Sequence, residues 1–123
     1  MKRLGKAVLI FIALIVVGLT IDYFNVARKE RQLSAAVSDC GGRLGSIPAW
    51  PLGTEYRITL NKVPDDDELI RLALANRMRG WVGIAFVDCE IARKNQNRLR
   101  ARLQNCYLFV VRNGTMSALG HNE

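Results

Sequence analysis

The chain has 123 residues, half of which are hydrophobic, and a formal net charge of +7. Without its apolar N-terminal stretch roughly 95 residues remain, which is enough for one small domain and excludes a second. From residue 28 onward there are 15 basic and 10 acidic residues, so the domain carries a moderate charge of +5. This charge is compatible with contact to anionic lipid or nucleic acid, but a solvated basic face explains it more simply.

An uncharged stretch at residues 7–21 follows the short basic N-terminus. It is shorter than the roughly 20 apolar residues that a membrane-spanning helix needs, but short apolar flanks extend it on both sides. Asp22 lies at the expected boundary, among aromatic side chains that favour the headgroup region. We therefore predict a single-pass membrane anchor over residues 1–27, followed by one domain over residues 28–123.

A cleaved signal peptide would share the basic start and the apolar core of this segment. The small-x-small cleavage site is not convincing, because Asn25 lies two residues before Ala27 and bulky aromatic residues precede both. We therefore favour an uncleaved anchor. Basic residues on both sides give only a weak positive-inside bias, but a short leading tail is typical of a signal anchor, and we expect the domain to lie outside the cytoplasm. The flanking basic residues are Lys2, Arg3, Lys6, Arg28, Lys29 and Arg31.

The segment after the anchor predicts a helix, a stop and a short strand. Residues 28–39 have apolar side chains at helical spacing, so the helix is expected to continue out of the membrane. Gly41 and Gly42 end it, because glycine accepts the left-handed conformation common at helix ends. A short strand is expected at residues 43–47, and the two prolines of residues 48–53 indicate a loop.

Residues 55–62 alternate apolar and polar side chains and predict a strand. The acidic run at residues 65–68 opens a helix over residues 66–78, where an aspartate caps the N-terminus and the carboxylates complement the helix dipole. A calcium loop is the alternative interpretation, but the glycine and the distal glutamate of an EF-hand are missing. The apolar set of this helix is Leu69, Ile70, Leu72, Ala73 and Leu74.

The C-terminal third predicts two more strands around one helix. Residues 81–86 are mostly apolar and indicate a strand buried on both faces, and residues 106–111 indicate a second buried strand. Between them residues 92–104 predict a helix. Asn113-Gly114 predicts a turn, and we expect no regular structure from there to the C-terminus. This alternation favours parallel strands joined by right-handed helical crossovers. The inward residues of the helix are expected to be Ala92, Leu99 and Leu103.

The predicted strands share a repeated pattern. Residues 81–91 fit the L-x-x-L-x-L-x-x-N/C-x-L template of a leucine-rich repeat, with Cys89 at the N/C position. In this pattern the small Asn or Cys side chain turns inward to satisfy loop carbonyls. Weaker copies centre on Ile58 and Leu108, at steps of 26 and 24 residues from Ile84. The repeat core is predicted to be Ile58, Leu60, Ile84, Phe86, Cys89, Ile91, Leu108, Val110 and Asn113.

From about Leu33 onward the chain resembles the small, membrane-anchored, leucine-rich-repeat-like proteins of bacteria. The resemblance covers roughly two thirds of the chain, and it departs from the family in having Val63 at the first Asn/Cys position and only about three units. It implies an α/β fold, a degenerate leucine-rich-repeat-like domain, more than it implies an activity. The residues that carry it are Gly41-Gly42, Tyr56-Arg-Ile-Thr-Leu60, Asp66-Asp67-Glu68-Leu69-Ile70 and Leu103-Gln-Asn-Cys106.

The cysteines do not form a recognisable metal motif. They lack C-x-x-C spacing, and the one histidine, His121, lies in the tail, so neither a zinc site nor a cofactor is expected. The odd number allows at most one internal disulfide, and Cys40 could pair with Cys106 if the domain is exported. Cys89 is expected to be a buried repeat residue and not a reactive thiol.

The sequence contains no recognisable catalytic constellation. It has no Gly-rich phosphate loop, no Gly-x-Ser-x-Gly and no histidine near a nucleophile. Asp88 and Glu90 are expected to be solvated at a strand end instead of forming an acid/base pair. The basic helix has no stacking aromatic residues, so a solvated outer helix is favoured over contact with anionic lipid, and nucleic acid is not expected as a partner. Its basic residues are Arg93, Lys94, Arg98, Arg100 and Arg102.

These observations favour a membrane-tethered, non-enzymatic module that binds another protein, with no evident small-molecule substrate. The alternative is a structural or assembly subunit held in a membrane complex by its helix. An exposed apolar patch on the strands would favour partner binding, whereas polar residues within the span would favour assembly inside the membrane. The span contains only Thr20 of this kind.

Overall fold

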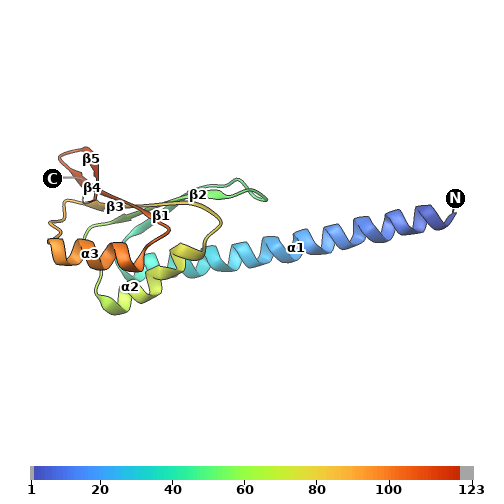
Figure 1. Cartoon of the computed structure of the whole chain (residues 1–123), viewed down its shortest axis with the longest axis horizontal. Coiled ribbons are helices and arrows are strands. Elements are labelled where there is room, and N and C mark those ends of the chain that lie inside the picture. Colours follow the sequence, from blue (N-terminus) through green and yellow to red (C-terminus); the bar gives the residue numbers. More distant parts are fainter. Residues whose placement is uncertain (1, 120–123) are drawn as a thin grey trace.

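A long helix dominates the computed structural model, which describes residues 2–119. This helix, α1 (Lys2–Asp39), runs without a break from the apolar segment into the domain, and its N-terminal half projects away from everything else (Figure 1). Within the described residues it is the one helix long and apolar enough to cross a membrane, and none of its most apolar stretch is buried. In lipid a helix satisfies its own backbone, so the projecting half is suited to a bilayer.

The predicted glycine stop is confirmed at the end of α1. The backbone N–H of Gly41 donates to the carbonyl oxygen of Ser38 at 2.9 Å, and the backbone N–H of Gly42 donates to the carbonyl oxygen of Val37 at 2.9 Å. Gly41 has a φ of +74°, a left-handed conformation that favours glycine. These are the two hydrogen bonds of a Schellman cap, which reverses the chain into the first strand.

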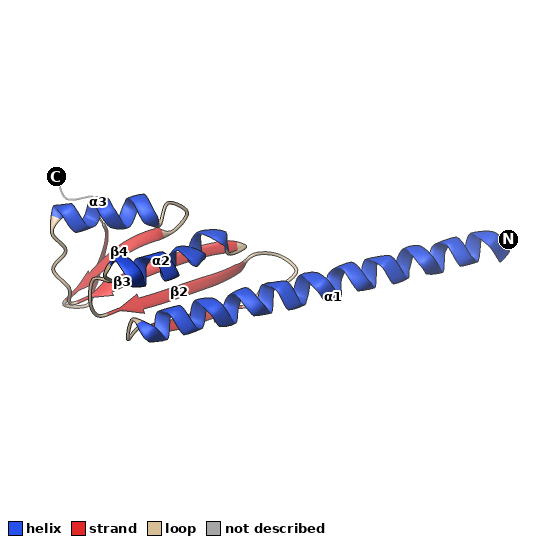
Figure 2. Cartoon of the chain, turned by 90° about the horizontal axis from the view of Figure 1, so that it is seen from below, coloured by secondary structure: helices blue, strands red, loops and turns tan. Residues whose placement is uncertain are grey.

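The remaining elements form a five-stranded sheet with helices between strands (Figure 2). The sheet order follows the chain order, and the three central strands are parallel, as the alternation predicted. In chain order the elements are β1 (Arg43–Ile47), β2 (Thr54–Leu60), α2 (Asp66–Leu72), the 3-10 helix η1 (Ala73–Arg77), β3 (Gly80–Val87), α3 (Arg93–Arg102), β4 (Tyr107–Arg112) and β5 (Thr115–Ala118).

The two outer strands are antiparallel to their neighbours. β1 and β2 are joined by a loop without a helix, so no crossover can make them parallel. Asn113 and Gly114 have φ values of 51° and 79°, which suit the tight turn of a hairpin. The turn was predicted, but the expectation of an irregular tail is wrong for residues 115–118, which form β5. The tail from residue 120 to 123 lies outside the described residues.

The domain has two layers, with α1, α2 and α3 on one face of the sheet (Figures 1 and 2). α1 packs through its last turns, and the phenol of Tyr56 on β2 donates to Glu30 at 2.6 Å. Ala92 was predicted to face inward but is exposed, because it is the N-cap of α3. Ile70, a member of the apolar set of its helix, is exposed on the outer side of α2. The buried core includes Leu33, Val37, Tyr56, Ile58, Leu60, Leu72, Ile84, Phe86, Leu99 and Leu103.

The prediction that residues 81–86 are buried on both faces is wrong. Val82, Ile84 and Phe86 lie under the helices and are almost fully buried. Trp81 and Ala85 face the other way and are only half-buried, because no element of the described chain covers that side of the sheet (Figure 1). This open face therefore carries apolar residues where an exposed strand face usually carries polar ones.

Candidate functional site

The predicted repeat core maps onto the helix-covered face of the sheet. Ile58, Ile84 and Leu108 are register partners across three strands. The next inward ladder is formed in the same way by Leu60, Phe86 and Val110. Equivalent positions of the proposed units therefore stack side by side, although Leu108 and Val110 are only partly buried.

The two predicted polar turn positions behave differently. Cys89 is buried, and its Sγ donates to the carbonyl oxygen of Val87 at 3.4 Å, as expected for a small side chain that turns inward. Ile91 is also buried and belongs to the hydrophobic core. Asn113 is exposed, because it occupies the tight turn into β5 and not the start of a helical crossover. Its assignment as a core position is wrong.

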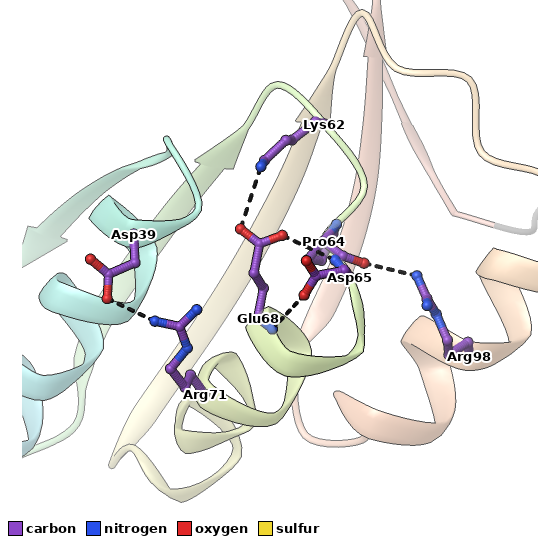
Figure 3. A network of polar contacts seen from close by, with 7 residues as sticks. All are labelled: Asp39, Lys62, Pro64, Asp65, Glu68, Arg71 and Arg98. Carbon is purple, nitrogen blue, oxygen red and sulfur yellow. Dashed lines mark hydrogen bonds and ion pairs between the residues drawn. The ribbon is translucent and has the colours of Figure 1, made fainter.

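The acidic run before α2 is a helix cap (Figure 3). The Asp65 carboxylate accepts a hydrogen bond from the backbone N–H of Glu68 at 2.8 Å. In return, the Glu68 carboxylate accepts one from the backbone N–H of Asp65 at 3.1 Å. Lys62 lies 3.4 Å from Glu68, and Arg98 of α3 pairs with Asp66 at 2.8 Å. The carboxylates are thus engaged in capping and in ion pairs that tie α2 to its neighbours.

Metal-ligating side chains do not gather elsewhere in residues 2–119. The three cysteines are free thiols, so the possible Cys40–Cys106 disulfide is absent from this structure. Burial raises the pKa of Cys40 and of Cys106 to about 11, and it also raises the pKa of Cys89. Such thiols are protonated near neutral pH and are poor nucleophiles. His121 lies outside the described residues.

The feature that stands out is an aromatic cluster on the open face. Trp81 of β3 stacks on Tyr107 of β4, with ring centroids 5.5 Å apart and planes 21° apart. Phe109 lies beside them, its ring centroid 6.3 Å from that of Trp81. Tyr107 and Met116 remain 57% and 59% exposed. Together these residues give β3, β4 and β5 one continuous apolar surface.

A hollow of about 290 Å³ lies next to the cluster. Gly83 and Ala85 line it, and the indole of Trp81 lies across Gly83 so closely that a Cβ there would overlap the ring. Arg57 on β2 forms part of its rim and pairs with Glu55 at 3.0 Å. The hollow has the chemistry of a contact surface, with apolar walls and one paired cation.

The sequence contained a signal for this surface, but the signal was misread. Trp81, Ala85 and Val87 alternate with the core residues of β3, and Tyr107 and Phe109 do the same on β4. Alternation with apolar residues on both faces predicts burial on both faces. The structure shows that the second face is apolar without a cover. Asp88 and Glu90 are exposed after β3, as predicted.

Comparison with known proteins found no matching family model, no matching curated protein and no matching solved structure.

Proposed function

We propose that the chain is a membrane-tethered, non-enzymatic module that binds another membrane-held protein through the open face of its sheet. The observation that carries the proposal is the cluster of Trp81, Tyr107, Phe109 and Met116 on a face that no part of residues 2–119 covers. Contiguous exposed apolar surface is rare on monomeric proteins and typical of interaction sites. Tryptophan, tyrosine, phenylalanine and methionine are the side chains enriched at such sites.

The direction of the open face supports a partner in the same membrane. β2, β3 and β4 run alongside the C-terminal part of α1 and point away from its N-terminal end (Figure 2). With α1 across the bilayer, the sheet stands upright and its open face looks along the membrane plane. A partner held at the same height meets this face at a high effective concentration, so a modest contact area is sufficient.

Charge favours a different protein over a second copy of the chain. The domain carries +5, so two copies repel each other at low ionic strength. Arg57 of β2 is on the open face. Arg43 of the edge strand β1 is on the same face, because its register partner Thr59 alternates with the buried residues of β2. We infer an acidic partner with an apolar patch of its own. Nucleic acid fits less well, because the two largest rings already stack on each other and do not present free faces to bases.

The leucine-rich-repeat-like organisation is part of the proposal. Its support is the ladder of Ile58, Ile84 and Leu108, which are equivalent repeat positions and also register partners. Longer solenoids bind partners on the extended surface that their repeats form together. The open face would serve that purpose here.

We also propose that the domain lies outside the cytoplasm, in line with a signal anchor that follows a short basic tail. A reporter enzyme that folds only when its disulfides form, fused after residue 123, is expected to be active. A silent reporter alongside an active cytoplasmic reporter in the same position would reverse the orientation.

Site-specific photo-crosslinking in intact membranes tests the partner proposal. A benzophenone amino acid at Phe109 is expected to give a discrete adduct with a second protein, and the same probe at Asn97, exposed on α3, is expected to give none. Ala85→Asp places a charge in the hollow and should abolish the adduct, whereas Asn97→Asp should not. No adduct at Phe109, equal adducts at both positions, or adducts that contain only this chain would refute the proposal.

The assembly alternative gains no specific support from the span. The hydroxyl of Thr20 donates to the carbonyl oxygen of Val16 in the same helix at 2.8 Å, so it is already satisfied within α1. An interaction that persists when the open face is charged, and that is lost when α1 is replaced by another spanning helix, would favour assembly through the membrane segment.

A further inference from the structure

The loop between β1 and β2, residues 48–53, reaches back along α1 toward the apolar segment (Figures 1 and 2). Its Trp50 packs edge-to-face against Tyr23 of α1, with ring centroids 5.3 Å apart. The indole and the neighbouring surface of α1 together form a shallow depression. It is lined by Val16, Leu19, Thr20, Tyr23, Phe24 and Trp50.

The position of Trp50 along α1 sets its depth relative to the bilayer. The uncharged stretch runs to Ile21, and the depression begins at Val16, inside that stretch. A helix rises about 1.5 Å per residue, so the last turns from Val16 to Ile21 span roughly 7–8 Å. The depression beside the indole therefore reaches the part of α1 that must lie in the membrane if the helix spans it.

A polar clamp holds the loop at this height. Asp22 is the single charged residue between Lys6 and Arg28, and its carboxylate accepts from Arg79 Nη2 at 2.6 Å and from Arg79 Nη1 at 2.8 Å. The same carboxylate accepts from Trp50 Nε1 at 3.2 Å. Arg79 also donates to the carbonyl oxygen of Pro51 at 3.1 Å. The clamp thus neutralises a carboxylate at the membrane boundary and fixes the loop against it.

The rest of the loop presents apolar side chains outward. Leu52 is 75% exposed, the most exposed of the large hydrophobic residues on the domain, and Ile47 at the end of β1 is 53% exposed. These residues border the same end of the sheet. In water this exposure is unfavourable, whereas at a bilayer surface leucine and tryptophan side chains gain free energy by partitioning.

We propose that residues 48–53 form a second membrane contact, in which Trp50 and Leu52 enter the boundary between headgroups and acyl chains of the bilayer that α1 spans. The occupant is phospholipid, because the loop is continuous with the span and meets it at membrane depth. The contact holds the domain upright, since a single helix would leave it free to tilt. The open face is then kept at one height and one direction relative to the membrane.

Tryptophan quenching by brominated phospholipid tests the proposal on the full chain in lipid nanodiscs. The chain has two tryptophans, so Trp81→Phe leaves Trp50 as the emitter. Bromine in the upper acyl chain is expected to reduce Trp50 emission at least twofold, while aqueous acrylamide quenches it weakly. The control carries Trp50→Phe, Trp81→Phe and Ile70→Trp, which places the emitter at a site on α2 that is 60% exposed. The control should show the reverse pattern.

A second variant separates lipid contact from packing against α1. Leu52→Asp changes an exposed residue, so it should leave the fold intact by circular dichroism but reduce the quenching of Trp50 by bromine about twofold. Trp50 emission that responds to acrylamide and not to bromine, as in the Ile70→Trp control, would overturn the proposal. A chain that fails to enter the discs would also overturn it, because the loop reaches lipid only through α1. Neither result depends on a protein partner.

Discussion

Replacing Gly83 with alanine tests whether the aromatic cluster is built as described. The indole of Trp81 lies across Gly83, and a Cβ at this position would overlap ring atoms. The backbone of Gly83 does not have a positive φ, so alanine itself fits the strand. The substitution therefore acts on one neighbour, the Trp81 ring, which must swing away from the sheet and from Tyr107.

The expected cost can be worked out from these contacts. Losing the stack of Trp81 on Tyr107 costs about 0.5–1.5 kcal/mol, and forcing a side chain off a well-packed position costs about 1 kcal/mol or more. Replacing glycine with alanine offsets about 0.4–1 kcal/mol by restricting the unfolded chain. We expect Gly83→Ala to lower the free energy of unfolding by about 0.5–2 kcal/mol.

The sign should reverse when the ring is absent. In a Trp81→Ala background nothing opposes the new Cβ, so Gly83→Ala should stabilise the domain by about 0.5 kcal/mol. Denaturant titration of the four variants in detergent micelles, followed by far-ultraviolet circular dichroism, measures this coupling. Equal destabilisation in both backgrounds would show that the indole does not lie over Gly83, and the account of the hollow would be wrong.

Further substitutions and a pH series test the core, the cap and the buried thiols. Phe86→Ala should cost about 3–5 kcal/mol because the ring is fully buried, whereas Ile70→Ala on the exposed side of α2 should change stability by less than about 0.5 kcal/mol. Asp65→Ala should lower stability by about 1 kcal/mol through loss of the cap, whereas Asp65→Asn should keep most of the stability that the cap provides. Burial raises the pKa of Cys106 from 9.0 to about 11, so the folded state keeps a proton that the unfolded chain loses between these values. Stability should therefore fall as the pH rises from 9 to 11, less steeply in Cys106→Ala, and a flat denaturation midpoint over this range would contradict the assignment.

Local patterns predicted most elements of the fold because local physics decides them. The Gly41 stop, the Asp65 cap and the alternation in β2 each depend on residues close together in the chain. β5 was missed because Thr115–Ala118 is only four residues long, and its pairing with β4 gives it order. The pattern of β3 showed two apolar faces, but only the arrangement of the helices shows which face stays open.

The clamp between Asp22 and Arg79 could not be predicted from sequence in the same way. The two residues are 57 positions apart, and each has an adequate local explanation as a boundary residue or as a solvated cation. Their pairing follows from the two-layer packing, which returns the start of β3 to the membrane end of the sheet. The contact of Trp50 with α1 could not be predicted either. Trp50 donates to Asp22, which lies 28 positions earlier in the chain.

The anchor and the open face are best understood as one arrangement. A flexible tether would let the apolar face turn toward lipid or toward any neighbour, which would make an exposed cluster of Trp81, Tyr107 and Phe109 an aggregation hazard. α1 instead enters the domain without a break, and its last turns pack into the core through Leu33 and Val37. The domain therefore cannot rotate about its own tether without unfolding those turns. Under the proposed function, a sheet held in this way would offer its apolar face in a fixed direction relative to α1, and selectivity for the proposed partner would come from that geometry as much as from side-chain chemistry.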